Sequence, residues 1–398
     1  MNVSYKCKSP SVFVYLILYI IYYLLDILYP MNIEDGSASV GRIYPQIAMG
    51  MIFAYSLFYV VVNFGFLNNK DIFKPFLLLL IFTSFYIPFV VGNKTLMDNF
   101  VQYLKINVAS VVFMGFYMGL RNKPKEIKWM YVIFVIQLIY SFYKLYYDYY
   151  YLMIVGVIAQ VEAFDSNAGF MLASLIPMSL ILPSPKIRTI IYLMVVVASM
   201  LSGQRAAALA AVISVPFAFS YIKQSSRRKS FVAIIILGII AIVAFSPLIM
   251  SAIDNILLRQ QLDSDAGTFG AGRSEFWMYV IESFFNGNFF NMIVGYGYYA
   301  VNSLLRLKYG MGIPAHNGFL QYMYTFGLIG LSLYSFIYIS VYHCYKDLKR
   351  KKNYFSGLVL LMLVVFFIRS ATSHGDLDIS YIPFFMPLAI VMAVKSSC

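Results

Sequence analysis

The feature that most constrains this chain is a series of long apolar runs joined by short polar segments. A run of about 20 apolar residues is long enough to cross a bilayer as a helix. Only 12% of the residues are charged and the mean hydropathy is +0.76, whereas globular domains carry about 25% charged residues. A β-barrel would instead show short alternating segments. The sequence therefore predicts an all-α, polytopic integral membrane protein, with residues 1–398 as a single membrane domain.

About twelve transmembrane helices are predicted from these runs. The predicted spans are residues 11–29, 44–65, 75–92, 100–120, 129–147, 167–183, 189–204, 206–222, 231–250, 316–342, 354–370 and 380–394. Most of the connections are short, but residues 251–315 form one long loop. A loop of this length in a compact protein is usually functional or has structure of its own.

The distribution of charge predicts the orientation. If the N-terminus is cytoplasmic, 20 of the 30 Lys and Arg residues fall in cytoplasmic segments, against three of the 17 Asp and Glu residues. The positive-inside rule favours this arrangement, with both termini cytoplasmic and the loop 251–315 on the outer side. The net charge of +13 then reflects topology, and no nucleic-acid partner is expected. The three cysteines, all on the cytoplasmic side, suggest neither a disulfide nor a metal site.

Arg205 stands between two apolar runs, in "SGQRAAAL" (Ser202 to Leu209). An arginine at membrane depth is costly and is a candidate functional residue. The alternative is an arginine that extends to the lipid headgroups. The alanines that follow allow close helix packing, which favours a buried guanidinium.

Arg273 begins a predicted amphipathic helix in the long loop, "GRSEFWMYVIESFFNG". Its apolar residues recur at helical spacing, which is typical of a helix lying on the outer leaflet, with Trp277 as an interfacial anchor. The apolar residues are Phe276, Trp277, Val280, Ile281, Phe284 and Phe285. The alternative for Arg273 is an ordinary contact with a lipid phosphate.

His316 begins the apolar run 316–342, and Pro314 suits the entry to a helix. The positive end of a helix dipole favours a neutral imidazole, which can accept a proton. Further along the run, Gly327 and Gly330 allow a close neighbour. The alternative is a polar interface residue that hydrogen-bonds to water.

Other polar motifs are weaker. "DSD" (Asp263 to Asp265) is like the metal-binding motif of nucleotide-sugar transferases, and Glu34 with Asp35 lies where lipid-sugar transferases keep a catalytic carboxylate. An acidic pair in a loop is more often a solvated surface. The last outer loop, Arg369 to Asp378, adds His374. The sequence contains no Walker loop, no HExxH and no G-x-S-x-G, which argues against ATP-driven transport and zinc proteolysis.

Three elements in order carry a family resemblance: "GQRAAAL", then "GRSEFW" with "GYG" at Gly295 to Gly297, then "HNGFLQYMYTFGLIG" from His316. Together they resemble the Wzy-C superfamily of O-antigen ligases and O-antigen polymerases, over roughly residues 200–340. Family members often carry a glutamate two residues before the first glycine of the last motif, where this chain has Thr325. The role of that glutamate therefore does not carry over.

The resemblance implies a GT-C-like fold and glycosyl transfer at the periplasmic face of the bacterial inner membrane. The donor would be a sugar chain on undecaprenyl diphosphate. It implies catalytic roles for Arg205, Arg273 and His316, with the arginines on the diphosphate and the histidine as general base. The residues expected to bind substrate are Arg205, Arg273, Asn317, Arg369 and His374. Neither a metal nor another cofactor is implied, and attack opposite the leaving group would invert the anomeric carbon.

The leading hypothesis is an O-antigen polymerase that moves a growing glycan onto a lipid-linked repeat unit. The same donor site would serve an O-antigen ligase, whose acceptor is the lipid A core. A flippase for lipid-linked oligosaccharides is an alternative, but its charges should lie along a path through the spans. A metal-dependent transferase using Glu34 and Asp35 is a further one. The expected partners are lipid-linked oligosaccharide as donor and acceptor, membrane lipids and a chain-length regulator.

Overall fold

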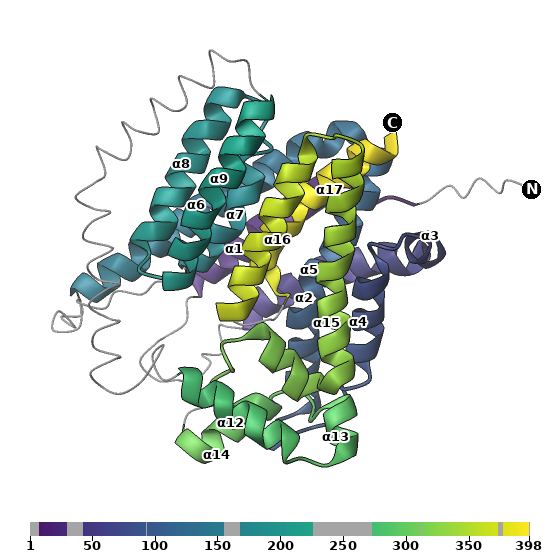
Figure 1. The fold of residues 1–398 in the computed structure, drawn as a ribbon, viewed down its shortest axis with the longest axis vertical. Coiled ribbons are helices and arrows are strands. Elements are labelled where there is room, and N and C mark those ends of the chain that lie inside the picture. Colours follow the sequence, from purple (N-terminus) through teal and green to yellow (C-terminus); the bar gives the residue numbers. More distant parts are fainter. Residues whose placement is uncertain are drawn as a thin grey trace, which may run out of the picture. The chain divides into compact units, whose positions relative to one another are not determined.

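The computed structural model describes residues 8–29, 43–92, 94–154, 168–225, 273–310, 312–372 and 377–397, and every regular element in these ranges is a helix (Figure 1). The chain divides into two compact units. Unit 1 comprises residues 1–88, 94–140 and 376–398, and unit 2 comprises residues 89–93 and 141–375. Whether the protein forms a single membrane domain, as the sequence suggests, stays a prediction.

Unit 1 is built around one central helix. Its elements are α1 (Val12–Leu28), α2 (Ile43–Val62), α3 (Phe64–Asn68), α4 (Lys74–Ser84), α5 (Leu96–Asn122), η2 (Pro124–Glu126), the first part of α6 (Ile127–Ile154), η4 (Ile379–Tyr381) and α17 (Ile382–Ser397). Helix α5 packs against α2, α4 and α17, and 94% of its most apolar stretch is buried. A helix that is apolar all round is typical of such a core. It starts at a capping box, in which Thr95 and Asp98 satisfy each other's backbone N–H groups.

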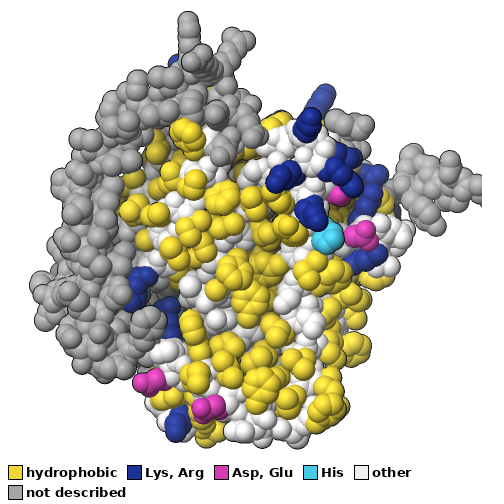
Figure 2. Space-filling view, viewed as in Figure 1, with side chains coloured by type: hydrophobic (Ala, Val, Ile, Leu, Met, Phe, Trp, Pro, Cys, Tyr) yellow, Lys and Arg dark blue, Asp and Glu magenta, His cyan; other side chains and the backbone are white. Residues whose placement is uncertain are grey.

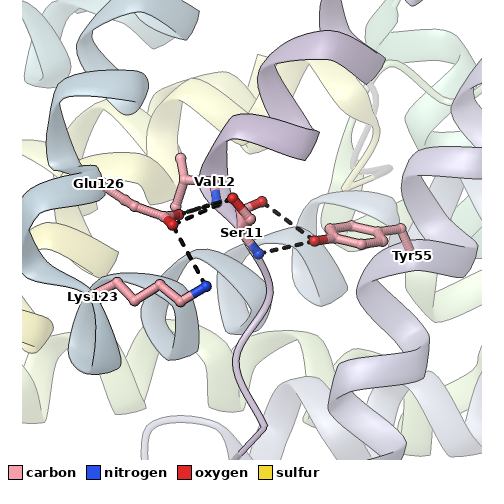
Figure 3. A network of polar contacts seen from close by, with 5 residues as sticks. All are labelled: Ser11, Val12, Tyr55, Lys123 and Glu126. Atoms are coloured by element: carbon pink, nitrogen blue, oxygen red, sulfur yellow. Dashed lines mark hydrogen bonds and ion pairs between the residues drawn. The ribbon is translucent and has the colours of Figure 1, made fainter.

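The start of α1 is held by a carboxylate from a distant part of unit 1 (Figure 3). Glu126 accepts hydrogen bonds from the backbone N–H of Val12 and from the Ser11 hydroxyl, and it pairs with Lys123 at 3.6 Å. The Ser11 N–H donates to the Tyr55 hydroxyl at 2.9 Å. Glu126 thus satisfies N–H groups that a helix start leaves open, and its charge suits the positive end of the helix dipole.

Unit 2 contains α7 (Ala168–Ser179), α8 (Pro185–Leu201), α9 (Arg205–Ser225), α12 (Arg273–Phe285), α13 (Phe289–Val294), α14 (Ala300–Tyr309), α15 (Gly318–Arg350) and α16 (Phe355–Thr372). Helices α9 and α16 pack together. They run antiparallel, because the Tyr221 ring near the end of α9 lies 6.0 Å from the Tyr354 ring just before α16. The start of α9 therefore lies at the same end of unit 2 as the end of α16, and we call this the arginine end.

Helix α15 is broken at Gly327, where the backbone has φ 68° and ψ −166°. The Tyr322 and Tyr334 rings stack with centroids 4.2 Å apart. In a straight helix, twelve residues would separate these positions by about 18 Å. The short first part of α15 therefore folds back along the second part, and residues 328–350 form the long helix. Helices α12, α13 and α14 gather where α15 begins (Figure 1).

A helix occupies each predicted span except 231–250, which lies outside the described residues. Within the described residues, five helices are long and apolar enough to cross a membrane: Ile43–Val62, Leu96–Asn122, Pro124–Asp148, Gly318–Arg350 and Phe355–Thr372. Hydrophobic side chains cover the middle of α15 and α16, and Lys and Arg gather where α15 ends (Figure 2). The architecture is that of a polytopic membrane protein. Twelve spans, cytoplasmic termini and a periplasmic loop remain predictions.

The predicted start of one span is wrong. Gly318 begins the helix, Asn317 is its N-cap and His316 precedes the cap, so the run 316–342 is neither helical from His316 nor continuous. The break arises because the glycine that suits close packing also accepts a backbone conformation that other residues avoid. The predicted helix beginning at Arg273 is confirmed as α12, which runs from Arg273 to Phe285. Its place on the outer leaflet stays a prediction.

Candidate functional site

Arg205 is the first residue of α9 and follows a tight turn at Ser202 to Gln204. Arg205 is partly exposed. Gly169, near the start of α7, lies against Ser202 and Gln204. Helix α7 therefore abuts the turn that presents Arg205, and the positive start of α9 adds to the positive charge of the guanidinium.

Arg369 lies one turn before the end of α16 and is only 6% exposed. Its Nη1 donates to the hydroxyl of Ser174 on α7. The guanidinium also lies 6.0 Å from the centroid of the Phe170 ring, which is within range of a cation–π interaction. One face of α7 thus supports Arg369, and the start of the same helix abuts the turn before Arg205.

Arg273 joins α12 to the end of α16. Its Nη1 donates to the carbonyl oxygen of Thr372 at 3.1 Å. Thr372 is the last residue of α16, where carbonyl groups lack partners within the helix. Because Arg369 lies three residues before Thr372, the two arginines are attached to the same turn of α16.

His316 lies in an extended strap, residues 312–317, between α14 and α15. The strap is tied at two points along its length. Asn302 of α14 donates to the Gly312 carbonyl at 3.1 Å, and the Trp277 indole N–H donates to the Ala315 carbonyl at 2.7 Å. The predicted role of Trp277 as an interfacial anchor is therefore incomplete, because its polar atom binds the strap.

The backbone at His316 has φ 52°, which few residues other than glycine adopt. Such a conformation costs about 1–3 kcal/mol. The neighbouring contacts offset it: Ala315 is bonded through both of its backbone groups, and the Asn317 side chain accepts from the Leu320 N–H at 3.2 Å. A hydrogen bond contributes about 1 kcal/mol net and an N-cap a similar amount, so three such contacts are enough to hold His316 in this conformation.

The break in α15 is closed by backbone contacts from the segment after α13. Tyr296 and Gly297 donate their N–H groups to the carbonyls of Tyr324 and Thr325, at 3.1 and 2.9 Å. A Cβ at Gly295 would lie 2.5 Å from the Gly327 nitrogen, and one at Gly327 would lie 2.2 Å from the Ile293 carbonyl. The backbone at Gly295 therefore packs directly on the backbone at Gly327, and the carbonyls of Tyr324 and Thr325 at the break have hydrogen-bond partners.

The structure brings most of the predicted site residues into one connected set at the arginine end. Helix α7 links the turn before Arg205 to Arg369, the end of α16 links Arg369 to Arg273, and α12 links Arg273 to the strap that carries His316. Asn317 belongs to the set as the N-cap beside His316. The remaining predicted residues, His374, Glu34, Asp35 and Asp263 to Asp265, lie outside the described residues. In the part of the chain that the structure describes, no three His, Cys, Asp or Glu side chains are grouped to hold a metal ion.

Three contributors were missed from the sequence: Ser174, Gln321 and the hydrogen-bonding role of Trp277. Each acts through a contact between segments far apart in the chain or across the strap. Spacing alone carries no signal for such contacts. The one available hint was that Trp277 stands four residues after Arg273, on the same face of a predicted helix.

Fold and site define a class: a helical membrane protein with arginines and a histidine collected at the ends of several helices. Residues 190–335 match the family model described as O-antigen ligase. The matched residues include the three motifs that resemble the Wzy-C superfamily of O-antigen ligases and polymerases, so the resemblance is confirmed over this part of the chain. A comparison with the curated proteins finds no match. Members of the family are glycosyltransferase-like and act on lipid-linked oligosaccharides in membranes.

Proposed function

We propose that this protein is an O-antigen polymerase at the periplasmic face of the bacterial inner membrane. It moves a glycan from undecaprenyl diphosphate onto a lipid-linked repeat unit without a metal ion. The observation that carries the proposal is the connected set of Arg205, Arg369, Arg273 and His316 at one end of unit 2. It combines fixed positive charge with one proton acceptor, which this reaction requires.

Arg205 and Arg273 bind the diphosphate of the donor. When the anomeric C–O bond breaks, negative charge grows on the diphosphate that leaves. A guanidinium binds phosphate oxygens through two parallel N–H groups and keeps its charge at every physiological pH. Donors fixed in place before the reaction stabilise the developing charge most effectively. The bond from Arg273 Nη1 to the Thr372 carbonyl holds the guanidinium itself, and the position of Arg205 at a helix start fixes the base of its side chain.

His316 accepts the proton of the acceptor hydroxyl. As that oxygen forms its bond to the anomeric carbon, its proton passes to an imidazole nitrogen and undecaprenyl diphosphate departs. Attack from the face opposite the leaving group inverts the anomeric configuration. A positioned general base contributes roughly 10²- to 10⁴-fold to the rate. Asn317 and Arg369 complete the substrate contacts together with His374.

The test uses purified full-length protein in lipid nanodiscs with undecaprenyl-diphosphate-linked repeat units. Longer lipid-linked chains are expected from the wild type, and none from His316→Ala at equal amounts of folded protein. His343→Gln is the matched control, because His343 is exposed on α15. Full-length polysaccharide from His316→Ala would refute the assigned role.

O-antigen ligase is the second candidate, because the matching family model carries that description. Polymerase is favoured by the departure from the family signature at Thr325, since polymerases are the more divergent group. Adding lipid A core to the assay separates the two, because a ligase attaches the glycan to the core whereas a polymerase lengthens the lipid-linked chain. Transport without any new glycosidic bond would indicate a flippase. Loss of activity with a chelator, restored by a divalent ion, would indicate the metal-dependent alternative.

A further inference from the structure

Ala315, the residue before His316, is held through both its backbone N–H and its backbone carbonyl. The carbonyl of Ala315 accepts the Trp277 indole N–H at 2.7 Å, and the Ala315 N–H donates to Gln321 Oε1 at 3.2 Å. Ala315 is fully buried, in a cluster with Val280 and Phe284 of α12. His316, which follows Ala315, is the residue with φ 52°.

Helix α12 carries two of the relevant contacts one turn apart. Arg273 and Trp277 are four residues apart and therefore lie on the same face of the helix. Arg273 binds the end of α16, and Trp277 binds the strap. Val280 and Phe284 anchor the next turns in the core. The short helix α12 thus sets the distance between Arg273, which is proposed to bind the diphosphate, and the strap that carries His316.

We propose that Trp277 and Gln321 are positioning residues that clamp Ala315 through its backbone carbonyl and N–H and so fix His316 relative to Arg273. The inference rests on the proposed function, in which His316 is the general base. Neither side chain needs to touch the substrate. Each removes one way in which the strap could relax toward an ordinary backbone conformation and move the imidazole. Misplacement of a catalytic group by about 1 Å costs on the order of 10²-fold in rate.

Trp277→Phe keeps an aromatic ring and removes the N–H donor. We expect a kcat roughly 10- to 100-fold lower with an unchanged KM for the lipid-linked donor, because donor binding rests on the arginines. Met278→Ala is the matched control, since Met278 is 58% exposed on the same helix, and its kcat should equal that of the wild type. A wild-type kcat for Trp277→Phe would overturn the proposal.

Gln321 provides a second, independent variant pair. Gln321→Leu removes the acceptor for the Ala315 N–H, whereas Gln321→Glu keeps an acceptor oxygen. The proposal expects a lowered kcat for the first and a recovered kcat for the second. A general loss of packing would instead be seen in both, as loss of monodisperse protein on size exclusion. Equal kcat values for Gln321→Leu and the wild type would overturn the clamp.

A chemical measurement separates this proposal from the proposed function. Diethyl pyrocarbonate modifies imidazole nitrogens, and mass spectrometry measures the modification of His316 separately from that of His343. The rate at which the reagent modifies His316 should change at least 3-fold in Trp277→Phe and Gln321→Leu, and it should stay at the wild-type value in Gln321→Glu. This change is smaller than the expected change in kcat, because access of the reagent depends less on the exact placement of the imidazole. Equal rates in all four proteins would overturn the positioning role whatever the glycan assay shows. If the modification rate of His316 changed in these variants while the wild-type protein formed no glycosidic bond, the positioning role would be supported and the proposed function would be refuted.

Discussion

Both units of this protein are built from apolar helices, but they differ in backbone conformation. Nine described residues have a positive φ, and all nine belong to unit 2: Gly92, Gly203, Gly295, Gly297, Tyr299, Gly310, His316, Gly327 and Lys352. None of the described residues of unit 1 does. Unit 1 packs ordinary helices around α5, whereas unit 2 departs from helical backbone most often between α13 and α15.

Buried charge follows the same division. Among the described residues, two charged side chains are buried, Arg188 and Arg369, and both lie in unit 2. The buried polar residues of unit 1 are uncharged, such as Asn107 and Thr83, which bond to each other. Strained backbone and buried charge are costly, and they persist where function requires them. The comparison therefore predicts that equivalent substitutions have different consequences in the two units.

The largest contrast is expected at glycine. Gly327→Ala would place a Cβ 2.2 Å from the Ile293 carbonyl in a backbone conformation confined almost entirely to glycine. We expect a loss of about 4 kcal/mol or more, or no folded protein. Gly50→Ala in α2 of unit 1 meets only the Leu104 Cδ1 at 3.8 Å and should be neutral or stabilising by up to about 1 kcal/mol. Thermal unfolding in detergent measures both, and equal midpoints would contradict the division.

The second contrast concerns arginine. Arg369→Ala removes a buried guanidinium and leaves the Ser174 hydroxyl without that donor. We expect a cost of about 2–4 kcal/mol and a raised KM for the lipid-linked donor. Arg121→Ala in unit 1 loses a guanidinium that lies 4.3 Å from the Phe66 ring centroid, worth about 0.5–1 kcal/mol. Its KM should not change. If Arg369→Ala kept the wild-type KM, Arg369 would be a structural residue alone.

The sequence predicts the regular helices of both units better than the breaks between them. Regular helices are read from apolar periodicity, so α1, α2, α5 and α16 match predicted spans to within a few residues. Arg205, Arg273 and His316 are predicted as site residues from the order of the motifs that carry them, and Arg205 also from the cost of charge at membrane depth. The sequence does not predict the fold-back at Gly327, because the fold-back depends on backbone hydrogen bonds from Tyr296 and Gly297, about 30 residues away. Local patterns cannot encode a contact that only the tertiary fold creates.

A smaller contrast is expected at helix caps. Asn317→Ala removes the N-cap of α15 beside His316, and Thr95→Ala breaks the capping box of α5. Each should cost about 1 kcal/mol of stability. Only Asn317→Ala should also lower kcat, because the cap adjoins the strap that carries the base. Steady-state kinetics and thermal unfolding of both variants test this, and a kcat for Asn317→Ala equal to that of Thr95→Ala would count against the strap as a catalytic element.

A last contrast concerns two buried threonines. The Thr325 hydroxyl is buried without a hydrogen-bond partner, whereas the Thr83 hydroxyl donates to the Leu79 carbonyl at 2.8 Å and accepts from Asn107 Nδ2 at 2.9 Å. Thr325→Val should stabilise the protein by up to about 1 kcal/mol, and Thr83→Val should destabilise it by about 1–3 kcal/mol.

Chemical or thermal unfolding of the two variants measures the difference. The sign matters more than the size, because valine has nearly the shape of threonine and the substitution isolates the hydroxyl. A destabilised Thr325→Val would mean that the hydroxyl has a partner in the membrane, such as water or substrate. Thr325 occupies the position at which family members often carry a glutamate. That result would therefore extend the polar site past the strap to the break in α15.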